Sequence, residues 1–209
     1  MHQAITMLVS VLLLVTPLVI GASDEQETDG RVIWIGLANG SEAETIMAKE
    51  LRDLIRTHDI EPWVLTNKIF IDERQIPHSH PVLTIHTRHI GAEQELLSAF
   101  MHEQLHWLEE EPWLGNFRAA MRDFENLFPE VPSSADGGAR DKHSTYRHLL
   151  VCDMELQVMT ALIGQTPARE ILAKMTHYEW IYEQVLNDPR VREVALTHGF
   201  DVSQGIPGR

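Results

Sequence analysis

The spacing of hydrophobic and polar residues changes near Gly91 and divides this chain into two parts. Before Gly91, short apolar runs bounded by turn-forming residues predict strands at 31–36, 63–65, 69–71 and 82–87. Between the first two strands, Ser41 and Glu44 form a capping box that predicts a helix through Arg56. The N-terminal part is therefore predicted to be a small sheet with one helix.

Beyond Gly91 the apolar residues recur at helical spacing almost to the end of the chain. This spacing predicts helices at 92–110, 113–128, 144–163, 167–187 and 189–198. Pro112 suits the first turn of the second helix, and Gly164 suits the position just after the third. The long break at 129–142 is expected to form the rim or lid of an active site.

These elements predict the α+β fold class, with a small N-terminal β-sheet and one helix followed by a mostly helical half. A chain of 209 residues is long enough for one domain, which we place at 24–200, followed by a flexible tail at 201–209. The formal net charge of −14 excludes nucleic acid and anionic lipid as partners, because both require clustered Lys and Arg.

The first 23 residues have a composition of their own, with an uncharged apolar run at 5–20 followed by Gly21, Ala22 and Ser23. This pattern predicts a secretory signal peptide cleaved after Ala22 or Ser23, and hence an exported protein, periplasmic or secreted. Because the segment before the run lacks Lys and Arg, an uncleaved membrane anchor is the alternative. Cys152 is the only cysteine and lies in an apolar helical run, which is typical of a small buried hydrophobic residue.

One pentapeptide specifies chemistry through its spacing. Residues 102–106 read His-Glu-Gln-Leu-His, so His102 and His106 project from one helical face, one turn apart, where two imidazoles can hold the same Zn²⁺. Glu103 lies beside them, placed to take a proton from a metal-bound water. The alternative is two surface histidines beside an ordinary glutamate, but the surrounding apolar residues favour a buried helix and a metal site.

The motif and its uncharged flanks resemble the signature of zincin-type zinc metallopeptidases; these flanks are Phe100, Gln104, Leu105, Trp107 and Leu108. The resemblance implies a zinc-dependent hydrolase that acts on a peptide or protein substrate, with Glu103 as general base; with the signal segment, this would be an exported enzyme. It also implies that extended substrate lies along an edge strand, and the order along the chain suggests 82–87. Metzincins are excluded, because Glu109 and Pro112 stand where their motif has Gly and His.

Two other functions stay open at this point. The first is a zinc hydrolase that acts on a non-peptide amide, such as a cell-wall component. The second is a non-enzymatic protein that keeps the metal for stability, which a closed coordination sphere would favour.

A catalytic zinc needs a third protein ligand, and the sequence offers three candidates downstream. The spacing of Glu125 resembles that of gluzincin aminopeptidases. If the chain folds back at Pro112, however, Glu125 lies about 18 Å beyond the turn while His106 lies about 9 Å before it. Glu125 is therefore the weakest of the three candidates.

The segment 146–155 carries the other two candidates, because His148, Cys152 and Glu155 share one stripe of an apolar helix. Buried polar side chains need partners, and a metal would supply one. Positions seven apart on a helix are separated by about 10 Å, so only one of His148 and Glu155 can be the ligand. Glu155 is favoured, giving a gluzincin-like site of His102, His106 and Glu155.

With Glu155 as the ligand, His148 or Tyr146 would stabilise the oxyanion, as His and Tyr do in related peptidases. His148 as the ligand, or as a hydrogen-bonded core histidine, stays open. The remaining histidines near the strand at 82–87 are expected to be solvated; they are His78, His80, His86 and His89.

Overall fold

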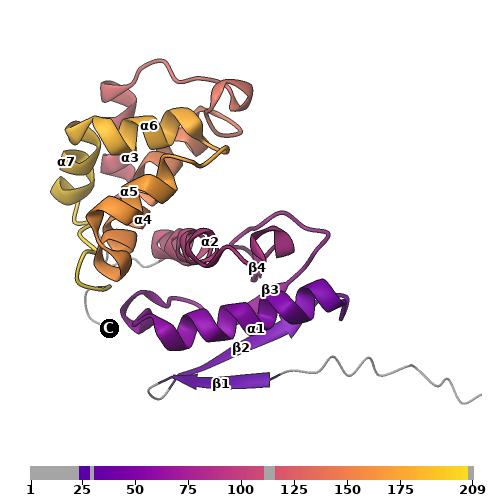
Figure 1. The fold of residues 1–209 in the computed structure, drawn as a ribbon. Coiled ribbons are helices and arrows are strands. Elements are labelled where there is room, and N and C mark those ends of the chain that lie inside the picture. The colour runs from indigo at the N-terminus through magenta and orange to yellow at the C-terminus, as the bar shows by residue number, and fades with distance from the viewer. Residues whose placement is uncertain (1–23, 29–30, 111–115, 207–209) are drawn as a thin grey trace, which may run out of the picture.

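The computed structural model describes residues 24–28, 31–110 and 116–206 and confirms the α+β fold class, with a small N-terminal sheet and a helical C-terminal half (Figure 1). The predicted signal segment at 1–23 and the predicted turn at Pro112 lie outside the described residues. Among the described residues, no helix has the length and apolar character needed to cross a membrane.

The sheet has four strands in the order β1-β2-β3-β4, with bounds β1 (Asp24–Thr28), β2 (Arg31–Leu37), β3 (Lys68–Ile71) and β4 (Leu83–Ile85). β1 pairs antiparallel with β2, whereas β2, β3 and β4 run parallel. Ile35, Ile69 and Leu83 lie in register across the parallel strands, and all three are fully buried. This row of side chains forms the base of the N-terminal core.

Helix α1 (Glu42–Thr57) packs on this sheet and buries Met47, Leu51 and Ile55. The hydroxyl of Ser41 caps the helix by accepting from the Glu44 backbone N–H at 3.2 Å, as the sequence predicts. The Glu44 carboxylate accepts from backbone N–H groups in the preceding turn and so joins the helix start to the end of β2.

The predicted strand at 63–65 is not part of the sheet. Residues Glu61–Trp63 form a 3₁₀ turn, and the backbone that follows bonds to the side chain of Gln104 instead of to a strand. Gln104 accepts from the N–H groups of Leu65 and Thr66 at 2.8 and 2.9 Å, and its own amide donates to the Thr66 carbonyl at 2.9 Å. One buried amide therefore fixes the motif helix to the sheet half.

The helical half is built around α4; its elements are α2 (Glu93–Leu105), a 3₁₀ turn (His106–Glu110), α3 (Phe117–Leu127), α4 (Lys142–Ile163), α5 (Gln165–Leu172), α6 (Glu179–Asn187) and α7 (Pro189–Thr197). Helices α2, α3, α5, α6 and α7 all pack on α4, which is buried on nearly every side, as its apolar sequence requires. Figure 1 shows α2 between the sheet half and the other helices. The motif helix therefore lies where the two halves meet.

The structure breaks the helix predicted at 167–187 into two. The chain turns at 173–178, and Tyr178 begins α6 with a left-handed backbone of φ 61° and ψ 35°. No Gly or Pro marks this turn in the sequence, so its apolar spacing resembles one continuous helix. The break lets α5 and α6 each bury an apolar face on α4.

The C-terminal segment also differs from the predicted flexible tail, because residues 201–206 pack against the sheet half. The Trp63 indole N–H donates to the Val202 carbonyl at 2.6 Å, and the Ile206 N–H donates to the Pro62 carbonyl at 2.9 Å. Val202 and Ile206 are buried, so two apolar anchors within a polar, Gly-containing stretch hold it in place.

Candidate metal centre

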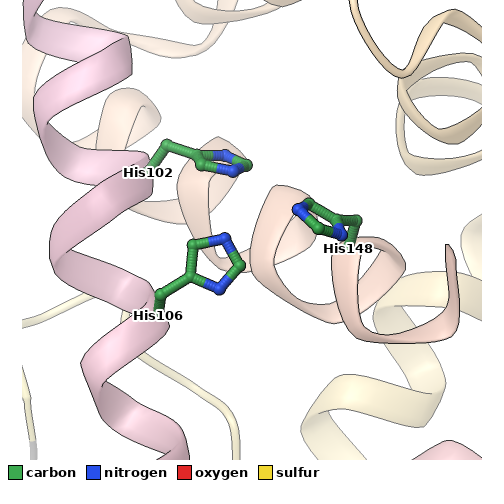
Figure 2. A group of neighbouring side chains, drawn as sticks. All are labelled: His102, His106 and His148. Atoms are coloured by element: carbon green, nitrogen blue, oxygen red, sulfur yellow. The ribbon is translucent and has the colours of Figure 1, made fainter. Parts of the chain in front are cut away.

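Three histidine side chains from two helices face one another in the core. His102 lies in α2, His106 lies one turn later where the 3₁₀ turn begins, and His148 projects from the facing side of α4 (Figure 2). Their ring centroids are 5.0 Å apart for His102–His106, 5.0 Å for His106–His148 and 5.7 Å for His102–His148. The two helices therefore place three imidazoles around one point.

The spacing of the donor atoms fits a single metal ion. One ring nitrogen from each histidine lies within 4.8 Å of the other two. Tetrahedral coordination with bonds of about 2.1 Å separates ligand atoms by about 3.4 Å, so a shift of each ring by about 1 Å would close the set. This chain thus contains a buried group of side chains that can bind a metal ion.

Hydrogen bonds behind the rings direct a free nitrogen of two histidines toward the group. Nδ1 of His148 lies 2.7 Å from the Ser144 carbonyl, which can only accept, so Nδ1 carries the proton. Nδ1 of His102 likewise donates to Oε2 of Glu155 at 2.9 Å. In the neutral form of either ring, Nε2 therefore carries the lone pair that a metal ligand requires.

Glu155, which the sequence analysis favoured as the third ligand, lies behind His102. Its Oε1 accepts from the Ser98 hydroxyl at 2.5 Å, and its Oε2 accepts from the Tyr182 hydroxyl at 2.8 Å as well as from His102. Both carboxylate oxygens are therefore used by neighbours on two helices, α2 and α6. The structure places His148, not Glu155, on the face shared by His102 and His106.

A second set of potential ligands, His102, Cys152 and Glu155, also has its donor atoms within 4.8 Å of one another. Access distinguishes the two sets. Cys152 and Glu155 are 0% exposed, whereas His102 and His148 keep 8% and His106 keeps 9%. The three-histidine set is thus the one that solvent or a ligand can reach, and the thiol of Cys152 remains a buried core group, as predicted.

Burial and neighbouring side chains determine whether His148 and His102 are protonated before a metal binds. Burial and the neighbouring His102 and His106 lower the pKa of His148 to about 3, so this imidazole is neutral at ordinary pH. Burial opposes charge on His102 too, but Glu155 and a hydrogen bond with Cys152 raise its pKa well above 6.5. A metal cation would take the place of that proton and keep the charge balance with Glu155.

Glu103 lies next to His102 on α2 and is 8% exposed. Burial raises the pKa of Glu103, while His102, His78 and Arg88 act in the opposite direction. A carboxylate with a raised pKa beside a reachable cluster is typical of a general base.

Tyr178, which the sequence analysis missed, covers one side of the cluster. Its ring packs on His148 at 4.2 Å between centroids and lies 6.2 Å from His102. No sequence signal identifies it, because it lies in the turn hidden inside the predicted helix at 167–187. Tyr146, the predicted oxyanion donor, instead donates its hydroxyl to the Phe128 carbonyl at 2.7 Å.

Glu125 is not part of the cluster. It is exposed and lies 3.7 Å from the ammonium of Lys142 at the surface. The geometric argument against it in the sequence analysis agrees with this position.

The predicted substrate edge at 82–87 is partly occupied. Thr84 donates to the His78 carbonyl at 2.8 Å and accepts from the His78 N–H at 3.2 Å, in an antiparallel bridge on the side away from β3. The segment at His78 therefore lies along the outer edge of β4. An extended ligand cannot pair with β4 at Thr84 while this bridge is formed.

The loop predicted as a rim is adjacent to the cluster through Tyr178. Part of it, 134–140, and the turn at 176–179 line an open pocket with a volume of about 360 Å³. Tyr178 separates this pocket from His148. Space for part of a ligand therefore lies one side chain away from the three histidines.

Comparisons with known proteins leave the site to be interpreted from its geometry, because no protein-family model, curated protein or solved structure matches this chain.

Proposed function

We propose that this protein is a zinc-dependent hydrolase of the metallopeptidase type, with His102, His106 and His148 as the zinc ligands. The observation that carries the proposal is the meeting of these three imidazoles, with a buried glutamate adjacent to one of them. Three nitrogen ligands with a fourth position open is a set that catalytic zinc uses, as in carbonic anhydrase. The third ligand is thus His148, in place of the Glu155 favoured by the sequence.

Zinc at this position would act as a Lewis acid and lower the pKa of a water into the neutral range. The residues of the chain supply the rest. Glu103 receives the proton of the attacking water and returns it to the leaving amine. Glu155 and the Ser144 carbonyl orient His102 and His148 through their Nδ1 protons. Tyr178 excludes solvent from one side of the cluster.

Zinc content and turnover test this proposal together. The purified wild type should contain close to one zinc per chain and cleave an unfolded protein substrate. Glu103→Gln should keep the zinc and the fold but lose hydrolysis, because a general base is not a ligand. Glu93→Gln is the matched control, since Glu93 is an exposed carboxylate on the same helix that pairs with His58 at 3.0 Å.

Three results would count against this proposal. Loss of zinc in Glu103→Gln would make Glu103 a ligand. A wild type without zinc would rule out the proposed hydrolase function. So would a zinc-loaded wild type that cleaves no peptide or other amide.

The hydrolysis of a non-peptide amide is a second candidate function, and the His78–Thr84 bridge favours it. With this bridge formed, β4 lacks the free edge at Thr84 that strand addition of an extended peptide would use. Parallel assays on unfolded protein and on amide-linked cell-wall fragments separate the two substrates. Turnover of the fragments alone would favour the second candidate.

A further inference from the structure

Arg88 lies on the sheet-half side of the metal centre and reaches toward the helical half. It belongs to the 3₁₀ turn Thr87–His89 between β4 and α2. Its Nε donates to Nε2 of His89 at 3.1 Å, and its Nη1 lies 3.5 Å from Nε2 of His177. His177 belongs to the helical half and directly precedes Tyr178, whose ring packs on His148. The contact between Arg88 and His177 therefore joins the sheet half to the turn that covers the cluster.

The contacts of Arg88 leave its positive charge without a neutralising partner. Burial, followed by the charge of Arg88, lowers the pKa of His89, so that partner is a neutral acceptor. The ion pairs among the described residues, with N–O distances up to 4.0 Å, do not include Arg88. This occurs in a chain with 31 Asp and Glu against 17 Lys and Arg. An acidic protein thus keeps an exposed guanidinium outside these ion pairs, in contact with the residue that precedes Tyr178.

Two neighbouring parts of the structure define where Arg88 lies relative to the reacting groups. On one side the turn that carries Arg88 leads into α2, the helix of Glu103 and of two of the proposed ligands. On the other side His177 and Tyr178 line the pocket of about 360 Å³. Arg140 also lines this pocket, but its guanidinium pairs with Asp141 at 3.2 Å. Arg88 contacts this pocket through His177, and among the described residues it belongs to no ion pair.

We propose that Arg88 binds a carboxylate of the substrate next to the bond that is cleaved. This inference rests on the proposed hydrolase function and names its substrate class: amides that carry a carboxylate close to the scissile bond. A guanidinium matches a carboxylate with two parallel hydrogen bonds, and Arg88 has no carboxylate partner among the described ion pairs. The carboxylate comes either from a free C-terminus or from an acidic side chain.

Four short peptides separate these two sources. The first pair, acetyl-Ala-Ala-Leu-Ala, ends in a free carboxylate or in an amide. The second pair is amidated at the C-terminus and has Glu or Gln in place of the last Ala. Calorimetric binding is measured on zinc-loaded Glu103→Gln, which does not turn the peptides over, and kcat and KM are measured on the zinc-loaded wild type.

We expect one acidic peptide to bind about 10–100 times more tightly than its neutral partner, because a charge-assisted hydrogen-bonded pair is worth about 1.5–3 kcal/mol. Adding Arg88→Gln to the binding protein should remove this preference, and Arg88→Lys should restore part of it. Arg74→Gln should keep it, because Arg74 is an exposed arginine of the sheet half whose removal changes the net charge equally.

Three results would overturn the inference. They are equal binding of acid and neutral peptides, equal weakening of both by Arg88→Gln, and an acid preference that survives in Arg88→Gln, which would mean that the carboxylate binds the metal directly. Hydrolysis by the wild type without acid preference would remove this inference alone. A protein that lacks zinc and all turnover would remove the proposed function, whereas the same four peptides, bound to the zinc-free protein with and without Arg88→Gln, would still decide whether Arg88 binds a carboxylate.

Discussion

Glu155 and His102 form a buried pair in which Nδ1 of the imidazole lies 2.9 Å from Oε2 of the carboxylate. The other side of the same ring faces His106 and His148. One histidine therefore links the metal face to a fully buried network that also contains Ser98 and Tyr182. This arrangement separates the residues that would hold a metal from those that orient them, and each set has its own consequence when removed.

Removal of His148 should release the metal. Because His148→Ala takes away one of three ligands, we expect zinc affinity to fall by orders of magnitude, as measured by competition with a chelator. Glu125→Ala is the control, since Glu125 is exposed and pairs only with Lys142 among its described contacts. Unchanged zinc in His148→Ala would return Glu155 to the position of third ligand.

Weakening of the Glu155 network should have a smaller effect on the metal. Glu155→Gln replaces an accepting oxygen with a donating group, so it cannot accept from His102, Ser98 and Tyr182 together. We expect zinc affinity about 10–100 times lower, in the range of other outer-shell changes. Tyr182→Phe should also lower zinc affinity, but by a smaller factor. A complete loss of zinc in Glu155→Gln at an intact fold would contradict this ranking.

The amide of Gln104 should matter for stability and not for metal binding. Gln104→Ala removes three hydrogen bonds to residues 65 and 66, and we expect the free energy of unfolding to fall by about 2–3 kcal/mol. Urea titration measures this loss, with the exposed Gln94→Ala as control. The folded variant should keep its zinc, because the amide points away from the cluster toward the sheet half.

Acid should weaken the link between the sheet and α1 through Glu44. Burial alone would raise the pKa of Glu44, but hydrogen bonds from Asn39, Glu73 and Gly40 lower it below its usual 4.5. The folded chain therefore binds this proton less tightly than the unfolded chain. The resulting stability is fully present above pH of about 4.5 and is lost as the pH falls through the lower folded value.

Glu44→Gln tests this dependence, because glutamine keeps the shape but does not titrate. Urea unfolding from about pH 7 to about pH 3 should show a difference between wild type and variant that narrows in acid. A difference that stays constant over this range would show that the carboxylate charge contributes nothing there.

The sequence by itself determined the fold class, the motif helix and the identity of the first two candidate ligands. Each of these depends on local spacing: a serine N-cap begins α1, apolar residues at helical spacing form α4, and positions four apart place His102 and His106 on one face. Such patterns lie within a few turns of one element, so no distant contact is needed to recognise them.

Only the tertiary structure decided between His148 and Glu155, because both belong to the same helix and the choice depends on how α4 is rotated against α2. It also decided that Tyr178 covers the cluster. The turn before α6 that places Tyr178 there has no Gly or Pro from which the sequence could predict it. The same holds for Arg88, whose partners come from both halves of the chain. Contacts between distant segments depend on packing, and packing is a property of the whole chain and not of any single stretch of it.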